Sequence, residues 1–303
     1  MKKVLITVVG PTAIGKTKLA IDLATYFKTE IISADSRQFY KEMTIGTAVP
    51  SGHELESIPH HFIQHKSIHE AYNVGDFEKD ALKVLDNLFK KHDYVVMAGG
   101  SGLYIDAVIQ GLDTFPEIDR EIRANLNTSL KKEGIEVLQN QLKELDPQYY
   151  AKADIQNPHR IIRALEICLG TGKSYSSFIN KKKDPRPFCT IMVGLSTERS
   201  ILYDKINKRV DTMIENGLVE EARSLYKHKN LNALQTVGYT ELFNFFDGKW
   251  DLDFAISEIK KNTRRFAKRQ LTWFRKNKNI VWAEKNTSFE EIIDKIMYLR
   301  QNM

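Results

Sequence analysis

Eight consecutive residues near the start of the chain carry the most specific chemical signal in the sequence. They follow an apolar run and fit the pattern G-x-x-x-x-G-K-[ST]: Gly10, Pro11, Thr12, Ala13, Ile14, Gly15, Lys16 and Thr17. Glycines let such a loop curl so that its backbone N–H groups and the start of the next helix surround one phosphate group. We expect Lys16 to contact the terminal phosphates and the Thr17 hydroxyl to bind Mg²⁺. The chain is therefore predicted to be an enzyme that binds a phosphorylated small molecule.

A carboxylate follows the next apolar run, at residues 30–34. Asp35 is expected at the carboxyl end of that strand, the edge where open α/β sheets bind their ligands. There it could accept a proton from an attacking nucleophile. A helix N-cap formed by Asp35 or Ser36 explains the position equally well. Three residues on, Gln38 offers an amide suited to the edge of a nucleic-acid base.

The sequence lacks two features of nucleotide hydrolases. The guanine-selecting motif NKxD is missing, and no apolar strand ends in an acid placed like a Walker-B residue. The apolar run at residues 94–98 leads instead into Gly99-Gly100-Ser101-Gly102, small residues that another chain or ligand can approach closely. An ATPase or GTPase activity is therefore disfavoured.

Positive charge is concentrated towards the end of the chain. The formal net charge is +6, and residues 260–278 contain nine Lys or Arg residues and no acid. Such a block is the electrostatic footprint of nucleic acid or another polyanion; a solvated basic helix face is the alternative. Helical spacing places a polar set on one face: Lys261, Arg265, Lys268, Thr272 and Arg275. A second face is expected to dock on the core through Ile259, Phe266 and Trp273.

Another helix is predicted to begin at Asn157-Pro158, a cap residue followed by proline. It carries Arg160 and Arg163 early, where cations are unfavourable by about 0.3–1 kcal/mol. The pair suggests an external anion such as a nucleic-acid phosphate, and an ion pair with Glu166 is the alternative.

Five of the eight histidines lie between residues 53 and 69. His61, His65 and His69 are four apart, which would align them as metal ligands on a helix. Pro59 and the β-prone stretch at residues 61–63 argue against that helix, so a metal site is disfavoured.

The elements that must position these residues follow an alternating pattern. Short Val- and Ile-rich runs at residues 4–9, 30–34, 94–98, 190–195 and 280–282 alternate with helical patterns, which predicts a parallel sheet covered on both faces. Residues 112–186 interrupt this rhythm with helical spacing alone, at 120–132, 135–145 and 159–169. The fold class is therefore predicted as α/β, a P-loop NTPase-like parallel sheet flanked by helices. Residues 1–111 and 187–303 form its core, and 112–186 form an all-helical insertion between the third and fourth strands.

Composition excludes several classes of protein. The chain has 303 residues, 42% of them apolar and 28% charged, which indicates neither disorder nor a fibre. Its two cysteines form no CxxC pair and indicate neither disulfides nor zinc. No apolar run reaches the roughly 20 residues that span a bilayer, and the first apolar run is too short for a signal peptide. We expect a complete cytoplasmic protein without a membrane partner.

Taken together, these motifs resemble the tRNA dimethylallyltransferase family, also called tRNA isopentenyltransferase. The resemblance runs nearly end to end and in family order. The matching segments are 10–17, 35–40 (DSRQFY), 59–61, 99–104, 157–166, 209–211, 217–221, 237–239 and 268–274 (KRQLTWF). The zinc-finger tail of eukaryotic members is absent, so the bacterial type is expected.

The resemblance implies a specific reaction. Dimethylallyl diphosphate, not ATP, would occupy the P-loop, and its five-carbon group would pass to N6 of adenosine 37 in the tRNA anticodon loop. Asp35 would act as general base, while Lys16, Thr17 with Mg²⁺, and Arg209 would hold the departing diphosphate. The implied tRNA contacts are Asp35, Ser36, Arg37, Gln38, Ser101, Arg123, His159, Arg160, Ile161, Ile162 and Arg163. The insertion would contact the anticodon stem-loop, and a monomer is expected.

Three other functions remain open from the sequence. A P-loop kinase would bind ATP and release ADP. An enzyme that prenylates free AMP would not need Arg160, Arg163 or the basic closing helix. A non-catalytic RNA-binding module would not explain why the chain has a P-loop and Asp35.

Overall fold

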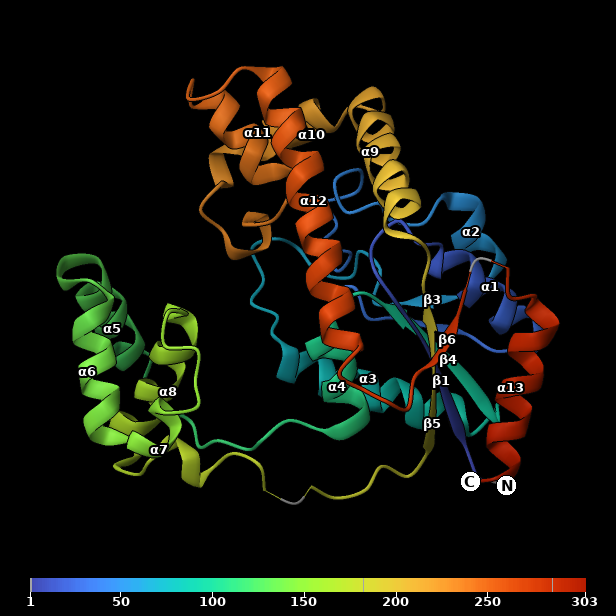
Figure 1. Ribbon diagram of the computed structural model, residues 1–303, viewed down its shortest axis with the longest axis horizontal. Coiled ribbons are helices and arrows are strands. Elements are labelled where there is room, and N and C mark those ends of the chain that lie inside the picture. The colour runs from blue at the N-terminus through green and yellow to red at the C-terminus, as the bar shows by residue number, and fades with distance from the viewer. Residues whose placement is uncertain (1, 182, 285) are drawn as a thin grey trace. The chain divides into compact units, whose positions relative to one another are not determined.

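The computed structural model describes residues 2–181, 183–284 and 286–303 (Figure 1). A six-stranded sheet has the order β3-β2-β4-β1-β5-β6, and every pairing in it is parallel. The strands are β1 (Val4–Val9), β2 (Ile31–Ser33), β3 (His60–His61), β4 (Tyr94–Gly99), β5 (Cys189–Leu195) and β6 (Val281–Ala283).

One strand was not predicted. β3 has only two residues and pairs with β2 through Ile31 and Ile32, so it depends on a partner that a local sequence pattern does not reveal. Its presence changes only the strand numbering around the helical insertion, which lies between β4 and β5, the same two apolar runs between which it was predicted.

Helices cover both faces of the sheet because β1 alternates its buried side chains between two cores. Val4, Ile6 and Val8 pack with α1 (Lys16–Tyr26) and α13 (Phe289–Gln301). Leu5 and Val9 face the larger core instead. That core includes α3 (Val74–Phe89) and α4 (Gly102–Gln110). All six residues of β1 are buried, as expected for a central parallel strand.

The parallel register brings three loops to one edge of the sheet. Val9 at the end of β1 lies opposite Gly99 of β4 and Gly194 of β5, and Ser33 of β2 lies opposite Ala98. The segments that follow β1, β2 and β4 therefore leave the sheet side by side. This edge is where the P-loop, Asp35 and the glycine-rich loop after β4 meet.

The chain between β5 and β6 forms a block of helices that short turns divide. It comprises α9 (Arg199–Glu215), α10 (Leu218–Leu225), α11 (Tyr239–Phe246) and α12 (Leu252–Phe274), with short 3-10 turns η2 (Tyr226–His228) and η3 (Asn232–Leu234). Gly217 and Gly238 precede α10 and α11 with positive φ, 96° and 100°, so each allows the chain to turn into a new helix. Across the residues that the structure describes, no helix is both long and apolar enough to cross a membrane.

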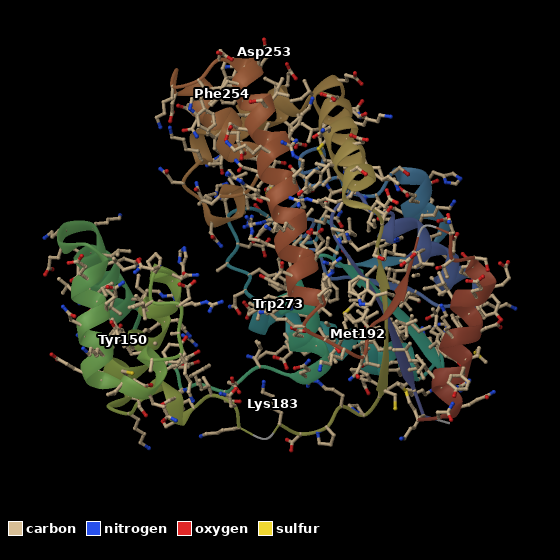
Figure 2. All side chains as sticks on the ribbon, in the orientation of Figure 1. Tyr150, Lys183, Met192, Asp253, Phe254 and Trp273 are labelled. Atoms are coloured by element: carbon tan, nitrogen blue, oxygen red, sulfur yellow. The ribbon has the colours of Figure 1, made fainter. Side chains whose placement is uncertain are left out.

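The buried face of α12 differs from the predicted one. Ala255, Ile259, Ala267, Gln270 and Phe274 are buried. Phe266 and Trp273, which were expected to dock on the core, are 38% and 37% exposed. Figure 2 marks Trp273 near the carboxyl end of this helix, which is drawn in orange. Both side chains line a cavity instead, and an apolar residue at a cavity wall has the same sequence signature as a core residue.

Residues 111–185 form a separate compact unit, whereas residues 1–110 and 186–303 form the other. Its helices are α5 (Arg120–Glu133), α6 (Ile135–Leu145), α7 (Pro147–Tyr150) and α8 (Pro158–Thr171), followed by the short turn η1 (Tyr175–Ser177). Leu126, Leu138, Leu142 and Leu165 belong to a core of its own. Lys182, near the end of the predicted insertion, lies outside the described residues.

Candidate active site

The loop at residues 10–17 has a backbone that only particular residues adopt. Gly10 has φ +148°, and a Cβ there would lie 3.0 Å from the Leu195 carbonyl oxygen. Gly15 has φ +111° and caps α1, which begins at Lys16. A Cβ built on Gly15 would meet no atom within 4 Å, so this side of the loop is open. The loop therefore presents the start of a helix to an unfilled space, as phosphate binding requires.

Two desolvated cations face this space. The Lys16 Nζ atom donates a hydrogen bond to the Pro11 carbonyl oxygen at 2.8 Å. Burial lowers the pKa of Lys16 to about 8, Asp35 opposes that shift and Arg209 adds to it. Burial also lowers the pKa of Arg209, and Asp35 and Glu54 act in the opposite direction. Asp35 is the carboxylate that acts on both cations, and two positive charges beside one negative charge leave a net positive charge that would stabilise a bound anion.

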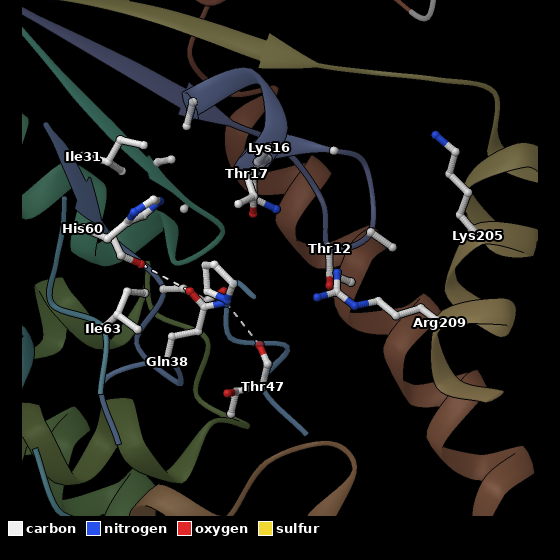
Figure 3. A pocket seen from close by; sticks show the side chains of 18 of the residues that line it. Thr12, Lys16, Thr17, Ile31, Gln38, Thr47, His60, Ile63, Lys205 and Arg209 are labelled. Atoms are coloured by element: carbon white, nitrogen blue, oxygen red, sulfur yellow. Dashed lines mark hydrogen bonds between the residues drawn. The ribbon is translucent and has the colours of Figure 1, made fainter. Parts of the chain in front are cut away.

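A cavity of about 430 Å³ opens beside these residues (Figure 3). Figure 3 shows Arg209 reaching from α9 towards Thr12, while Ile31, His60 and Ile63 lie on the other side of Lys16 and Thr17. The cavity thus has a cationic end and a more apolar end. We refer to it as the P-loop cavity.

A second cavity, of about 640 Å³, adjoins the first. Its wall includes Tyr104, Phe266 and Trp273 together with Arg269 and Ser101. The lining of this aromatic cavity overlaps that of the P-loop cavity at four residues: Thr12, Asp35, Thr47 and Arg209. A ligand in one cavity would therefore meet a ligand in the other beside a carboxylate and a guanidinium.

Asp35 lies two residues after the end of β2, at the predicted edge of the sheet, but no helix begins there. Its Oδ1 atom accepts a hydrogen bond from the Arg37 backbone N–H at 3.2 Å, within a turn that spans residues 36–39. The helix N-cap alternative is therefore wrong, and the carboxylate instead supports a local turn. Its position in the walls of both cavities leaves it available to a ligand.

The residues after Asp35 are largely engaged by other parts of the chain. The Ser36 backbone N–H donates to the Ser101 hydroxyl at 3.0 Å, and the two hydroxyls are 3.1 Å apart. Arg37 donates to the carbonyl oxygens of Asn232 and Ala233. Ser36, Arg37 and Ser101 also line the aromatic cavity.

Gln38 lines the P-loop cavity rather than the aromatic cavity. Its amide nitrogen donates to the Thr47 and Ala48 carbonyl oxygens at 3.2 and 2.9 Å, and its amide oxygen accepts from Ser33 at 3.3 Å. Both amide donors are thus directed at the protein, and Gln38 fixes the segment that carries Thr47.

A carboxylate on α10 holds the same segment from its other side. The Glu221 carboxylate accepts the backbone N–H groups of Thr44, Ile45 and Gly46 at 2.8–3.0 Å. The Tyr239 hydroxyl donates to Glu221 at 2.7 Å, and the Tyr239 ring leaves no room for a side chain at position 46. The motifs at residues 217–221 and 237–239 therefore shape the shared wall between the cavities.

Known proteins match this fold and sequence over most of their length. The profile described as IPP transferase matches residues 38–277. The chain is 63% identical over 296 residues to the tRNA dimethylallyltransferase of Christiangramia forsetii, covering 98% of each chain. It is 58% identical over 301 residues to that of Flavobacterium johnsoniae, covering 97% of each. The chain belongs to the IPP transferase family. It is therefore a transferase, and the enzyme class predicted from its motifs is confirmed.

Solved structures of IPP transferases share the fold. The full-length tRNA isopentenylpyrophosphate transferase of Bacillus halodurans superposes with a TM-score of 0.72 at 37% identity, covering 100% of this chain and 96% of that one. A eukaryotic dimethylallyltransferase described as acting on tRNA superposes with a TM-score of 0.84 at 26% identity, covering 99% of this chain and 80% of that one. The predicted fold class is confirmed.

Each glycine of the loop after β4 in this IPP transferase makes room for a different neighbour. A Cβ at Gly99 would lie 2.3 Å from the Ala34 carbonyl oxygen, and one at Gly102 would lie 2.3 Å from the Trp273 ring. Gly100 makes room for the buried amide of Gln270, which bonds the Gly100 carbonyl oxygen and the Thr12 backbone N–H. The Thr12 N–H is therefore not among the amides available to a phosphate.

Three residues of this site were not predicted from the sequence. Lys205 and Lys208 line the P-loop cavity beside Arg209 on α9. Lys205 lies three residues before Lys208 and four before Arg209, and this helical spacing was a usable signal. Gln270 gave no comparable signal, because its partners are far away in the sequence.

Part of the basic charge on α12 is neutralised within the protein. The Lys260 Nζ atom lies 2.5 Å from Asp211, and Lys261 is bonded to Glu258 at 2.7 Å. Arg264 donates to Asn207. The charges of Lys260 and Lys261 are thus paired within the protein, whereas Arg269 lines the aromatic cavity.

Two cations of the helical unit share one carboxylate. Glu166, whose side chain is 10% exposed, contacts Arg163 at 2.9 Å and Arg123 at 3.5 Å. The predicted alternative of an ion pair is thus confirmed for Arg163, although two cations on one carboxylate leave a net positive charge. His159 and Arg160 are exposed.

Two residues that were predicted to contact tRNA lie in the core of this unit. Ile161 and Ile162 are 0% and 4% exposed. Their side chains face the core of this unit, so the predicted contact of these two residues with tRNA would have to be made by their backbone. The matching motif at residues 157–166 joins core positions and surface positions because a helix alternates its faces.

The histidines near residue 60 do not form the helical row that metal binding would need. His61 lies in β3 and its Nε2 atom is 2.7 Å from Glu30. His65 packs edge-on against Phe39, Phe62 and Tyr72. Within the described ranges, no three His, Cys, Asp or Glu side chains come together in a way that could hold a metal ion.

Proposed function

We propose that the chain transfers the dimethylallyl group of dimethylallyl diphosphate to N6 of adenosine 37 in tRNA and releases diphosphate. The single observation that carries the proposal is the pair of adjoining cavities whose walls share Asp35 and Arg209. The name tRNA dimethylallyltransferase, borne by relatives up to 63% identical, supports the same reaction. In this arrangement the donor lies in the P-loop cavity and the acceptor base in the aromatic cavity.

The cationic end of the P-loop cavity suits a diphosphate. Lys16, Arg209 and the start of α1 would bind its oxygens and stabilise the charge that develops as the C–O bond breaks. The diphosphate would in turn raise the pKa of Lys16 from about 8 by favouring the charged amine. The more apolar end, which includes Ile31 and Ile63, would hold the hydrocarbon.

The donor set beside the P-loop fits Mg²⁺. The Thr17 hydroxyl lines the same cavity as Lys16, and a hydroxyl together with phosphate oxygens supplies the oxygen ligands that this ion prefers. Thr17 would hold the ion against the diphosphate. When bound, Mg²⁺ neutralises charge on the departing group.

Asp35 supplies the base for the acceptor. The exocyclic amine of adenine is a poor nucleophile because its lone pair is delocalised into the ring. As N6 forms a bond to C1 of the dimethylallyl group, the bond from C1 to the diphosphate oxygen breaks and an N6 proton passes to the Asp35 carboxylate. The two cavities meet at Asp35, where this transfer has to occur.

The acceptor must leave its stack to reach the aromatic cavity. A base in an anticodon loop can be turned outward and stacked on aromatic side chains, and Tyr104, Phe266 and Trp273 line the cavity. Arg160, Arg163 and Arg123 would contact the RNA backbone. The reaction would take place in the cytoplasm, which holds tRNA, and the enzyme would act as a monomer.

The release of diphosphate tests this function. The enzyme is mixed with dimethylallyl diphosphate and unmodified tRNA, and diphosphate is measured in the presence and absence of tRNA. We expect release only when both substrates are present, together with tighter calorimetric binding of dimethylallyl diphosphate than of ATP. Formation of ADP from ATP, or diphosphate release with free AMP in place of tRNA, would support one of the rival activities instead.

A further inference from the structure

Gln270 joins the P-loop to α12 by hydrogen bonds, beside an apolar contact in which Ala13 and Ile14 pack with Ala267 and Leu271. Its amide oxygen accepts the Thr12 backbone N–H at 2.9 Å, and its amide nitrogen donates to the Gly100 carbonyl oxygen at 3.0 Å. Gln270 is 6% exposed. A backbone N–H can only donate and a carbonyl oxygen can only accept, so these partners fix the orientation of the amide.

Gln270 and Lys16 hold opposite ends of one peptide group. The Pro11–Thr12 peptide presents its carbonyl oxygen to the Lys16 Nζ atom and its N–H to Gln270. Peptide planarity makes the two ends turn together, so a bond at either end fixes the direction of the other. When Lys16 turns to a bound diphosphate, Gln270 is the remaining side chain that holds this peptide.

We propose that Gln270 is a positioning residue that fixes the Pro11–Thr12 peptide for diphosphate binding. Thr12 lines both cavities, so the direction of this peptide sets part of the wall where donor and acceptor meet. The peptide also offers Lys16 a carbonyl partner while the cavity holds no anion. Gly100 is needed for the same contact. A Cβ at this position would lie 2.2 Å from the Gln270 amide nitrogen and would displace the amide.

The inference rests on the proposed function in that it takes the ligand of the P-loop cavity to be a prenyl diphosphate. Gln270→Met keeps the length of the side chain and removes both hydrogen bonds. Inorganic diphosphate and dimethylallyl diphosphate are the probes, measured by calorimetry, and tRNA binding is measured separately. Affinity for both diphosphates should fall by about 10-fold, because the Pro11–Thr12 peptide would then have to be ordered as the ligand binds. Affinity for tRNA should fall much less than affinity for diphosphate, because Gln270 is only one of many residues that line the aromatic cavity, where the acceptor base is placed.

Gly100→Ala provides a second route to the same change. The added Cβ displaces the Gln270 amide without altering the glutamine, so diphosphate binding should weaken as in Gln270→Met. The double variant should bind diphosphate no more weakly than the weaker single variant, because both substitutions remove one interaction. Gln139→Met is the matched control: it removes a glutamine bond to the Ile155 carbonyl oxygen in the helical unit and should leave diphosphate affinity unchanged.

Wild-type diphosphate affinity in a folded Gln270→Met or Gly100→Ala variant would overturn the inference. Equal losses of tRNA and diphosphate affinity would also overturn it, because they would indicate a general loss of structure. A wild-type enzyme that binds inorganic diphosphate but transfers nothing to tRNA would refute the proposed function and still leave Gln270 open to this test.

Discussion

Replacing Asp35 with asparagine separates the chemical step from binding. The asparagine side chain would keep an oxygen that can accept the Arg37 N–H, so the turn at residues 36–39 should persist. The variant loses only the basic carboxylate that lies in the walls of both cavities. A positioned general base contributes about 10²–10⁴ in rate, equivalent to about 3–5 kcal/mol at the transition state.

One electrostatic side effect has to be controlled. Asp35 raises the pKa of Lys16, so removing its charge should lower that pKa further below about 8. At high pH the variant would then bind diphosphate less well because Lys16 has lost its proton. Measurements at about pH 6.5 keep more of Lys16 protonated and isolate the loss of the base.

The assay is single-turnover transfer from dimethylallyl diphosphate to tRNA with enzyme in excess. We expect Asp35→Asn to lower the rate by about 10²–10⁴ with little change in the affinity for either substrate. Asp86→Asn, at an exposed ion pair with Lys90, is the matched control and should keep the wild-type rate. A near wild-type rate in Asp35→Asn would refute the assignment of the base.

Three further outcomes follow from charges in the structure. Lys16→Ala should weaken diphosphate binding as well as turnover, which calorimetry would detect; unchanged binding would contradict the assigned role. Affinity for tRNA should fall steeply as salt is added. Arg160→Ala should reduce the slope of log affinity against log salt by about one. Lys260→Ala should change that slope less, because the Lys260 side chain is already paired with Asp211. Burial lowers the pKa of His65 in the folded protein. As pH falls, this imidazole therefore becomes protonated in the unfolded state before it does in the folded state. The free energy of unfolding should then decrease as pH falls below about 6.5. His65→Phe should make that decrease shallower in urea titrations, and an identical pH dependence would contradict this reasoning.

The parts of the site that the sequence could predict are those whose residues are neighbours in the chain. The P-loop is eight consecutive residues after a strand, and its shape depends on glycines within it. Asp35 lies two residues after the end of β2, so strand and carboxylate could be placed together. Both predictions needed only local geometry and the rule that parallel strands end at one edge.

The parts that could not be predicted depend on distant partners. β3 exists because it pairs with β2, and Gln270 matters because it bonds Thr12, 258 residues away. Phe266 and Trp273 have the spacing of core residues but line a cavity. Sequence spacing identifies a helix face, whereas the fold decides whether that face meets a core or a cavity.

The position of the transferred group on tRNA tests the central claim most directly. Labelled dimethylallyl diphosphate is incubated with the enzyme and unmodified tRNA, and the product is digested to nucleosides and to short fragments for mass spectrometry. We expect label on N6 of adenosine 37 and on no other nucleoside. Label on another nucleoside, or no transfer to tRNA by an enzyme that binds both substrates, would contradict it.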